Sequence, residues 1–328
     1  MKVAVYSYRD FDEAEWFEKY SKELGIELVI CKDAPVYGEN LDLAKGCDAI
    51  SILTTVVPEN SVKQLKEYGV KYISTRTIGY NHIDISAAKK YGIAAGNATY
   101  DPDGVADYTI MMMLMTIRKI KAITRRAAAQ DFTLNGIQGK EIRDFKIGVV
   151  GTGRIGAAVI KRLSGFGCEI IAYDVYQRED LKDIVKYVSF DELLKESDMI
   201  TLHAPFLEEN FHLINEETIS KMKDGVVIIN TARGELIDTH ALVKAIKTGK
   251  VSAAGLDVCE HEFHMYYNDL RNEIIDNPDL AQLKSFPNVI VTPHMAFYTE
   301  NAINSMVKNS LLSIKAHIEG KENPWRVV

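Results

Sequence analysis

The sequence predicts an α/β protein with two doubly wound parallel-sheet domains. Short apolar runs of strand length alternate with amphipathic helical patterns along most of the 328 residues, and this alternation is typical of βαβ units. A glycine-rich turn of the form G-x-G-x-x-G stands near the middle of the chain, at residues 151–156. Turn-forming residues crowd together at 97–104 (NATYDPDG) and indicate a crossover between the two domains.

The first domain is predicted at residues 1–99 and 300–328. The amphipathic segment 299–317 follows the last strand of the second domain, and we expect it to return to cover the first. The first domain would then be discontinuous in the sequence. Its predicted strands are 3–6, 28–31, 49–53, 72–74 and 93–95, and its predicted helices are 12–24, 59–68 and 85–91.

The second domain is predicted at residues 100–299. We expect a long helix from residue 105 to about residue 130, capped by Asp103. Its methionine-rich middle is apolar on more than one side, which is typical of a helix in a core or an interface. Core packing is the first interpretation, and packing of part of the helix on a second subunit, in a homodimer, is the further one. The later predicted strands are 147–150, 169–173, 199–203, 226–230, 253–257 and 289–292, with helices at 216–222 and 238–248.

The glycine-rich turn has the spacing of a dinucleotide-binding motif. Gly151 permits a tight turn out of the preceding strand, Gly153 lets the backbone approach a pyrophosphate, and Gly156 lets the next helix pack closely on its strand. The N-terminus of that helix would then hold the phosphates with its free N–H groups. A strand-to-helix turn that binds nothing is the alternative, because the motif alone has limited specificity.

An acidic residue after the next strand supports the dinucleotide interpretation. Strand 169–173 ends in Asp174, where a carboxylate would accept hydrogen bonds from the ribose hydroxyls of NAD. Val175 and Tyr176 follow, so no arginine stands beside the acid to welcome the 2′-phosphate of NADP. The sequence therefore predicts NAD as the cofactor.

The charge and hydropathy of the chain exclude several classes of partner. A formal net charge of −7 without a basic run argues against nucleic acid, because nonspecific binding to a phosphate backbone rests on clustered Lys and Arg. The N-terminus lacks a secretory h-region, and the apolar stretch 110–117 is too short to span a bilayer. We expect a cytoplasmic protein with no membrane partner.

The cysteines and histidines do not predict a metal site or a disulfide. One local cluster, at residues 259–264, contains Cys259, His261, Glu262 and His264, but it lacks the i, i+4 histidine pair that places two ligands on one helix face. We expect no metal. The cysteines are widely scattered and are interpreted as reduced: Cys31, Cys47, Cys168 and Cys259.

Three polar residues follow predicted strands of the second domain, where ligands bind in doubly wound sheets. Arg233 offers a planar fork suited to a carboxylate. His294 is a candidate acid/base because an imidazole titrates near neutrality, and Glu262 would orient it and favour its charged form. Taken singly, these residues could equally be a surface arginine, a structural histidine and a solvated glutamate. Together with a nicotinamide they would complete a hydride-transfer site.

Several motifs, in this order and spacing, resemble the D-isomer-specific 2-hydroxyacid dehydrogenase family, and within it the D-lactate dehydrogenase branch. The likeness covers nearly the whole chain. It is carried by TRTIGYNHID (75–84), NATYDPDGVADYT (97–109), VGTGRIG (150–156) with Asp174, TLHAP (201–205), NTARGELID (230–238), LDVCEHE (256–262) and TPHMAFYT (292–299).

The resemblance implies a Rossmann-type coenzyme domain, a smaller flavodoxin-like substrate domain, and reduction of a 2-oxo acid to the D-2-hydroxy acid by NADH. It implies that Arg233 holds the substrate carboxylate and that His294, paired with Glu262, exchanges the proton at C2. The N–H groups of Ile78 and Gly79 would also bind the carboxylate, although an ordinary strand-to-helix turn is an equal alternative from the residues alone. Tyr100 and Phe297 would line the pocket around the substrate side chain. The implied cofactor-binding residues are Val105, Gly151, Gly153, Arg154, Ile155, Gly156, Asp174, His203, Ala204, Pro205, Thr231, Ala232 and Asp257.

The resemblance leaves the substrate side chain open. Pyruvate is the first expectation, which would make the protein a D-lactate dehydrogenase, and 2-hydroxyisocaproate or phenyllactate would also fit the three catalytic residues. From another class, an NAD-sensing scaffold resembling the corepressors of this superfamily is the alternative. Such a scaffold is expected to carry extended tails for partner motifs, which are not evident here.

Overall fold

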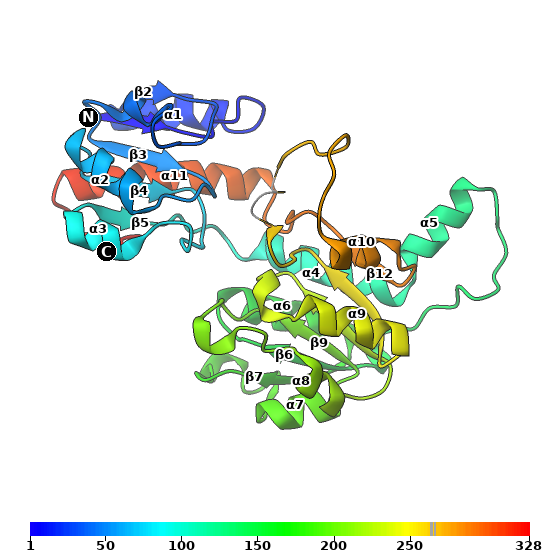
Figure 1. The fold of residues 1–328 in the computed structure, drawn as a ribbon. Coiled ribbons are helices and arrows are strands. Elements are labelled where there is room, and N and C mark those ends of the chain that lie inside the picture. The colour runs from blue at the N-terminus through cyan, green and yellow to red at the C-terminus, as the bar shows by residue number, and fades with distance from the viewer. Residues whose placement is uncertain (263–264, 266) are drawn as a thin grey trace. The chain divides into compact units, whose positions relative to one another are not determined.

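The computed structural model describes residues 1–262, 265 and 267–328. It divides into two compact units, one formed by Met1–Asp101 with Tyr298–Val328 and the other by Pro102–Phe297 (Figure 1). Each unit is built on a sheet in which every described strand pair is parallel. The predicted fold class, two parallel-sheet α/β domains, is confirmed.

Unit 1 has a five-stranded sheet in the order β2-β1-β3-β4-β5. Its central strands are buried on both faces, as parallel strands between helices are. The helices α2 and α3 cover one face and α1 and α11 the other. The strands are β1 (Lys2–Val5), β2 (Glu27–Ile30), β3 (Ala49–Ile52), β4 (Tyr72–Thr75) and β5 (Ala94–Gly96), and the helices are α1 (Ala14–Leu24), α2 (Glu59–Glu67), α3 (Ile85–Tyr91) and α11 (Glu300–Ile318).

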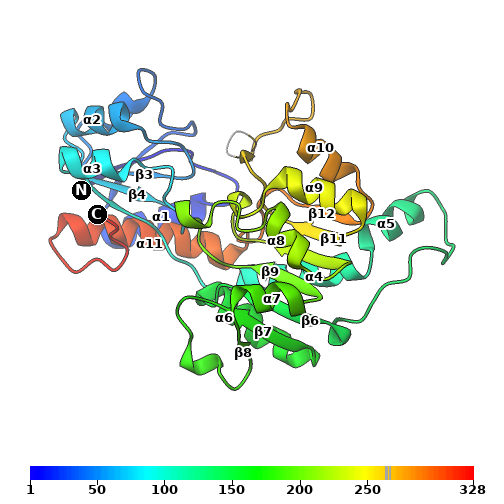
Figure 2. The ribbon, with the colours of Figure 1, turned by 60° about the horizontal axis from the view of Figure 1, so that its bottom comes forward.

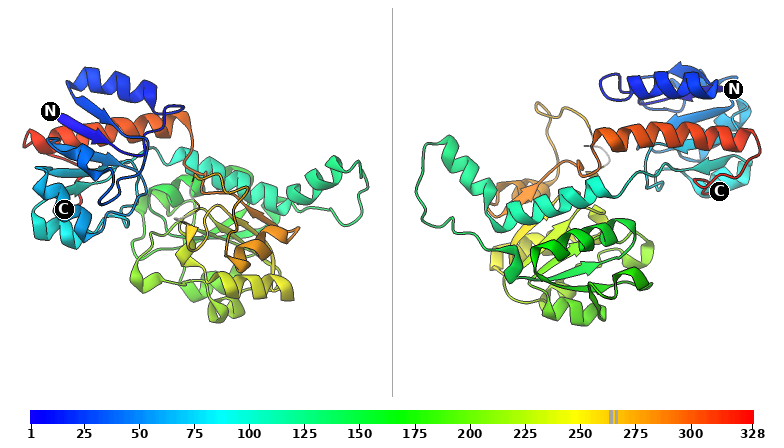
Figure 3. Two further views of the ribbon diagram at one scale, coloured as in Figure 1. Left: turned by 45° about the horizontal axis from the view of Figure 1, so that its top comes forward. Right: turned by 180° about the vertical axis from the view of Figure 1, so that it is seen from behind.

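The C-terminal helix α11 packs across the sheet of unit 1, on the same face as α1 (Figure 3). Its buried face combines apolar residues with serines, which bond to the strands beneath: Ser310 Oγ lies 2.9 Å from Ser51 Oγ, and Ser313 Oγ lies 2.7 Å from the hydroxyl of Tyr72. Thr299 caps its N-terminus by accepting a hydrogen bond from the N–H of Ala302 (3.2 Å). The hydrogen bonds of Ser310 and Ser313 fix where the helix lies along the strands.

Unit 2 has a seven-stranded sheet in the order β12-β11-β10-β9-β6-β7-β8. One core lies between this sheet and α4 with α6, and a second lies on the other face with α7, α8 and α9 (Figure 2). The strands are β6 (Lys146–Val150), β7 (Glu169–Tyr173), β8 (Lys186–Tyr187), β9 (Met199–Leu202), β10 (Val226–Asn230), β11 (Val251–Leu256) and β12 (Val289–Val291). The helices are α4 (Asp103–Ile117), α5 (Ile120–Ala128), α6 (Arg154–Leu163), α7 (Phe190–Glu196), α8 (Glu216–Lys221), α9 (Thr239–Thr248) and α10 (Pro278–Ser285).

The single helix predicted from residue 105 to about residue 130 is wrong, because the chain breaks between α4 and α5. Lys119 adopts a left-handed conformation (φ 56°), which ends the run of helical hydrogen bonds. The carbonyl of Ile117, which an unbroken helix would use for Lys121, instead accepts from the N–H of Lys140 (3.1 Å). The N–H of Lys140 thus occupies the carbonyl group that would have accepted the next helical hydrogen bond.

Asp103 does not cap α4 as predicted. It is the first residue of the helix, and the N-cap position is held by Pro102, which makes no capping bond with its side chain. Its carboxylate instead lies 2.9 Å from Nη2 of Arg162 on α6. Asp103 thus pairs α4 with α6 through Arg162 instead of capping its own helix.

In the part of the chain that the structure describes, no helix is long and apolar enough to cross a membrane.

Candidate active site

The glycine-rich turn between β6 and α6 has the geometry of a phosphate cradle. Gly151 has a φ of 90°, and a Cβ there would lie 2.7 Å from the backbone nitrogen of Ala204. A Cβ on Gly156 would overlap the carbonyl oxygen of Gly151, so helix and strand pack as closely as the motif requires. A Cβ on Gly153 would meet nothing within 4 Å. This open space at the N-terminus of α6 is where a pyrophosphate fits.

Asp174, at the end of β7, lies beside this turn. Its Oδ2 accepts hydrogen bonds from the N–H (2.5 Å) and the Oγ1 (3.1 Å) of Thr152. Its Oδ1 accepts from the N–H of Tyr176 (2.9 Å). The carboxylate is therefore held in one orientation next to the glycine turn, as a ribose-binding acid must be.

The loop after β9 closes the other side of the glycine turn. The N–H of His203 donates to the carbonyl of Val150 (2.7 Å), which brings His203 and Ala204 against Gly151. Burial lowers the pKa of His203 to about 3, so the ring is neutral near pH 7. Nε2 of the ring lies 2.9 Å from Oγ1 of Thr201, while the buried Nδ1 has no hydrogen-bond partner among the described residues. Pro205, the last member of the predicted motif, is exposed.

The three candidate catalytic residues follow neighbouring strands of the same sheet. Asn230 of β10 pairs with Leu256 of β11, which pairs with Val291 of β12, so the carboxyl ends of these strands lie at one edge. Arg233, Glu262 and His294 each come a few residues after these paired positions. The parallel register thus gathers at one edge three residues that are far apart in the sequence.

Glu262 and His294 form a direct pair. Nδ1 of His294 lies 3.1 Å from Oε1 of Glu262, which is only 7% exposed. The other carboxylate oxygen, Oε2, accepts from the N–H of Cys259 (2.9 Å). Nδ1 is thus the nitrogen of the His294 ring that faces the carboxylate.

Asp257 builds the turn that carries His294. Its Oδ1 accepts from Thr292 Oγ1 (2.6 Å) and the N–H of Met295 (2.9 Å), and its Oδ2 accepts from the N–H of Ala296 (2.8 Å). His294 itself has a φ of 53°, a left-handed conformation that a residue other than glycine holds only when its surroundings stabilise it. The buried Asp257, 1% exposed, supplies these contacts.

Arg233 lies in the loop after β10, and it has no acidic partner among the described residues. Gly234 packs so closely on the backbone of Cys259 that a Cβ would overlap it, which brings the loop after β10 against the loop after β11. The guanidinium of Arg233 donates to the carbonyl of Ala232 (2.6 Å), and among the described residues it forms no ion pair. A partly buried guanidinium with several remaining donors is suited to an anionic ligand.

Among the implied cofactor-binding residues, Thr231 and Ala232 directly follow β10, and Val105 lies in α4 of the same unit. Oγ1 of Thr231 lies 2.8 Å from Oγ1 of Thr109, whose hydroxyl also lies 2.8 Å from the carbonyl of Val105. The N–H of Ala232 donates to Oδ1 of Asn230 (2.9 Å). Hydrogen bonds thus connect the first turns of α4 with the end of β10. In the glycine turn, Arg154 and Ile155 begin α6.

Unit 1 contains the Ile78–Gly79 loop, whose carbonyl groups are all bonded within the unit. The carbonyl of Thr77 accepts from the N–H of Ala98 (3.0 Å), that of Ile78 from Asn97 Nδ2 (2.7 Å), and that of Gly79 from Thr77 Oγ1 (2.6 Å). Among the described residues, no hydrogen bond occupies the N–H groups of Ile78 and Gly79. Two neighbouring N–H groups without a hydrogen-bond partner among the described residues could donate to an anionic ligand.

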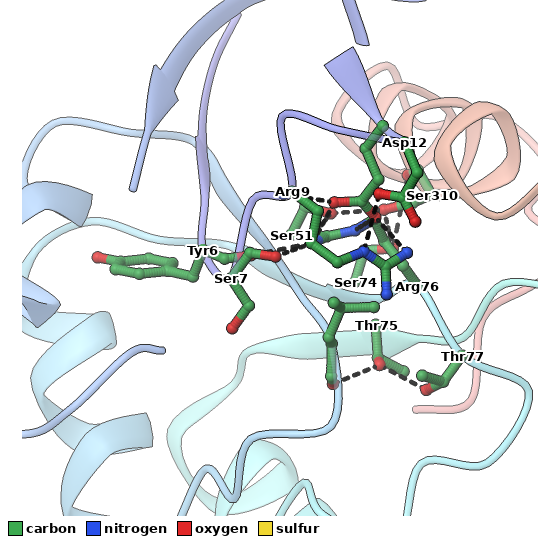
Figure 4. A network of polar contacts seen from close by, with 12 residues as sticks. Tyr6, Ser7, Arg9, Asp12, Ser51, Ser74, Thr75, Arg76, Thr77 and Ser310 are labelled. Atoms are coloured by element: carbon green, nitrogen blue, oxygen red, sulfur yellow. Dashed lines mark hydrogen bonds and ion pairs between the residues drawn. The ribbon is translucent and has the colours of Figure 1, made fainter. Parts of the chain in front are cut away.

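Arg76 and Thr77, which lead into this loop, belong to a network of polar contacts in unit 1 (Figure 4). Arg76, which precedes Thr77, is fully buried, and its Nε donates to Oε1 of the equally buried Glu13 (2.9 Å). Its Nη2 donates to the carbonyls of Tyr6 (3.0 Å) and Ser7 (3.1 Å). These bonds join β4 to the ends of β1 and α1, so the strand that leads into the loop has little freedom.

The two residues implied for the substrate side chain fall in different units. Tyr100 belongs to unit 1 and is partly exposed. Phe297 belongs to unit 2, where it is 8% exposed and its ring centroid lies 6.2 Å from those of His294 and Tyr267. Phe297 is therefore placed beside the candidate acid/base.

Among the described residues, no group of three or more His, Cys, Asp or Glu side chains could hold a metal ion. His264, part of the cluster considered from the sequence, lies outside the described residues.

The sequence prediction missed the residues that position the site rather than form it. Thr152 and Tyr187 hold Asp174, Asn97 holds the carbonyl of Ile78, and Glu13 with Arg76 supports the loop. The location of Thr152 between two motif glycines was the one available signal. The others come from elements distant in the sequence and carry no local pattern.

Comparison with known proteins agrees with this geometry. Residues 110–296 match the family model described as D-isomer specific 2-hydroxyacid dehydrogenase, NAD binding domain. An aromatic 2-oxoacid reductase of Clostridium sporogenes is 43% identical over 319 residues, which cover 96% of each chain. A D-specific alpha-keto acid dehydrogenase of Enterococcus faecalis is 45% identical over 301 residues, 92% of each. The solved structure of a D-lactate dehydrogenase from Treponema pallidum superposes with a TM-score of 0.90 at 33% identity and covers 100% of both chains.

The fold and the site define an NAD-dependent oxidoreductase. The chain belongs to the D-isomer specific 2-hydroxyacid dehydrogenase family. The predictions of family, cofactor and enzyme class are therefore confirmed.

Proposed function

We propose that this enzyme reduces a 2-oxo acid to the D-2-hydroxy acid, with Arg233 as the carboxylate-binding residue and His294 as the proton donor. The observation that carries the proposal is the pair of His294 and Glu262 at the same edge of the sheet as an arginine that has no acidic partner among the described residues. An anionic substrate would supply the missing partner, and the pair would supply the proton.

In this proposal Arg233, Glu262 and His294 have different roles. Arg233 binds the carboxylate through two parallel N–H donors and places the keto oxygen near Nε2 of His294. Glu262 accepts from Nδ1, which keeps the proton to be transferred on Nε2 and stabilises the imidazolium. In the reverse direction the neutral ring accepts the proton of the hydroxyl group. The bound nicotinamide supplies the hydride.

We also propose that the cofactor binds along the glycine turn of unit 2. The N-terminus of α6 and the open space at Gly153 suit the pyrophosphate, and Asp174 suits the adenosine ribose. The loop at His203–Pro205 and the residues Thr231, Ala232, Asp257 and Val105 would line the remainder. We propose unit 1 as the substrate domain, which the free N–H groups of Ile78 and Gly79 support, and we expect hinges near Tyr100 and Thr299.

We propose pyruvate as the substrate, as the name of the Treponema pallidum relative indicates. An aromatic 2-oxo acid is the second candidate, because a relative with that name is 43% identical. The test is NADH oxidation with pyruvate, 4-methyl-2-oxopentanoate and phenylpyruvate at matched concentrations. A kcat/KM highest for pyruvate supports the first candidate, and one highest for phenylpyruvate supports the second. Absence of turnover with every 2-oxo acid would refute the catalytic proposal.

We propose that the enzyme is a cytoplasmic homodimer and that its α5 segment contributes to the interface. None of the residues of α5 is buried, and Phe132 and Leu134 in the following loop are 80% and 85% exposed. Lys121 fixes the segment to the body by donating to the carbonyls of Phe286 and Val289 (both 2.6 Å). A segment that is held in place and exposes apolar residues could pack against a second copy of the chain.

Light scattering on a sizing column tests the homodimer. Phe132→Glu combined with Leu134→Glu is expected to shift the mass toward the monomer, whereas Ile274→Glu, at a position 97% exposed outside the segment, is expected to leave it unchanged. A wild-type monomer would exclude the dimer, and a dimer in both variants would place the interface elsewhere.

A further inference from the structure

A chain of hydrogen bonds runs from β8 to Asp174. The N–H of Arg178 donates to the hydroxyl of Tyr187 (3.1 Å), and that hydroxyl donates to Oγ1 of Thr152 (3.0 Å). Oγ1 of Thr152 in turn donates to Oδ2 of Asp174 (3.1 Å). The chain thus crosses from the edge strand of the sheet to the glycine turn and ends at the acid after β7.

The groups at the two ends of this series of hydrogen bonds fix the donor and the acceptor in each bond. A backbone N–H can only donate, and an ionised carboxylate can only accept. The hydroxyl of Tyr187 therefore accepts from Arg178 and donates to Thr152, and the hydroxyl of Thr152 donates to Asp174. Bonds that run in one direction polarise and strengthen one another.

The bonds to Asp174 leave it limited capacity for a ligand. A carboxylate has about four acceptor positions. Thr152 occupies two of them, both on Oδ2, and the N–H of Tyr176 occupies one on Oδ1. About one position on Oδ1 remains, and its direction is set by the bonds on Oδ2. A ribose hydroxyl can therefore bind well only while Thr152 keeps the carboxylate in this orientation.

We propose that Tyr187 is a positioning residue for cofactor choice, acting on Asp174 through Thr152. Without its hydroxyl, Oγ1 of Thr152 loses its donor and the carboxylate gains freedom to turn. NADH then loses affinity, while NADPH, which gains nothing from an ordered carboxylate, loses less. The inference rests on the proposed role of Asp174 as the acid that binds the ribose.

The test is fluorescence titration of the full chain with NADH and with NADPH, to obtain Kd for each. Tyr187→Phe is expected to raise the Kd for NADH by roughly three- to tenfold, the range of one neutral hydrogen bond, and to change that for NADPH by less than about twofold. The kcat at saturating NADH should stay close to that of the wild type. Thr152→Ser, which keeps the hydroxyl, should retain NADH affinity better than Thr152→Ala.

Two comparisons separate this role from a general loss of packing. Tyr173→Phe is the matched control, because the ring of Tyr173 packs on Phe190 and its hydroxyl is not part of the chain; it should leave both Kd values unchanged. In an Asp174→Ala background, Tyr187→Phe should have no further effect, because the residue it acts on is gone.

The outcomes identify which step is wrong. Additive effects of Tyr187→Phe and Asp174→Ala, or equal losses of NADH and NADPH affinity, would overturn the role of Tyr187 and leave Asp174 as the ribose acid. An Asp174→Ala variant with wild-type Kd values for both cofactors would overturn the proposed role of Asp174 and with it this inference. Neither result would affect the assignment of Arg233 and His294, which turnover assays test separately.

Discussion

Nδ1 of His294 lies 3.1 Å from Oε1 of Glu262, and a second oxygen of the same carboxylate is fixed by the N–H of Cys259. The loop after β11 thus holds Glu262, and Glu262 orients the imidazole of His294 in the loop after β12. The hydrogen bond between the two side chains sets which nitrogen of the His294 ring faces the carboxylate.

The first prediction compares Glu262→Ala with Glu262→Gln. Alanine removes the partner that orients the ring of His294, whereas the amide oxygen of glutamine can still accept a hydrogen bond from Nδ1. We expect Glu262→Ala to lower kcat for reduction of the 2-oxo acid by roughly tenfold or more, and Glu262→Gln to lower it by less. The rate of NADH oxidation is the measurement. Equal kcat in the wild type and in Glu262→Ala would show that Glu262 does not position His294.

The second prediction concerns Arg233→Lys. A lysine keeps the charge but loses the two-pronged donor, and a charged hydrogen bond contributes about 1.5–3 kcal/mol. We expect kcat/KM for the 2-oxo acid to fall by more than roughly tenfold, with the Kd for NADH almost unchanged. Near-normal turnover in this variant would remove Arg233 from the substrate site.

The third prediction concerns Asp174→Ala. The carboxylate favours ribose hydroxyls and repels a 2′-phosphate, so the wild type should prefer NADH strongly, and the variant should narrow the difference between the two cofactors. The ratio of kcat/KM for NADH to that for NADPH is the measurement. Equal efficiency with both cofactors in the wild type would contradict the role of Asp174.

The fourth prediction follows from the pKa of His203, which burial lowers to about 3. The unfolded state binds a proton near pH 6.5 and the folded state does not, so this residue's contribution to stability is complete above about pH 6.5 and is lost as pH falls toward 3. At about pH 5.5 the loss is at most about 1.4 kcal/mol. Urea unfolding of the cofactor-free protein should therefore show a steeper acid loss in the wild type than in His203→Gln. Identical pH dependence would mean that His203 becomes protonated in the folded protein.

The fifth prediction concerns the buried pair of Arg76 and Glu13. Burial lowers the pKa of Arg76, and Glu13 opposes that shift. Removal of one partner leaves an uncompensated buried charge, which costs about 3–5 kcal/mol. Glu13→Ala should therefore lower the free energy of unfolding by about that amount, and Glu13→Leu with Arg76→Met by less. If the double variant proved less stable than the single one, packing rather than charge would explain the effect.

The sequence predicted the fold because strands and helices depend on local patterns, and the same patterns indicated which polar residues follow strands. Asp174 directly follows β7, and Arg233 and His294 come three residues after β10 and β12. The parallel register of the sheet then gathers Arg233 and His294 with Glu262. The break at Lys119 was not predictable, because it depends on a bond from Lys140, a residue that returns after a long loop. The contact of Tyr187 with Thr152 also joins residues distant in the sequence, so no local sequence pattern indicated it. The strand β8, which contains Tyr187, has only two residues and was too short to predict.

The left-handed backbone of His294 bears on the choice of an inactive variant. At a φ of 53°, alanine would strain the turn, whereas asparagine adopts this conformation readily. His294→Asn should thus remove the proton donor while it preserves the turn held by Asp257. A protein that is intact but unable to turn over is what is needed to trap a 2-oxo acid together with NADH in a crystal, and the substrate side chain could then be identified by direct observation.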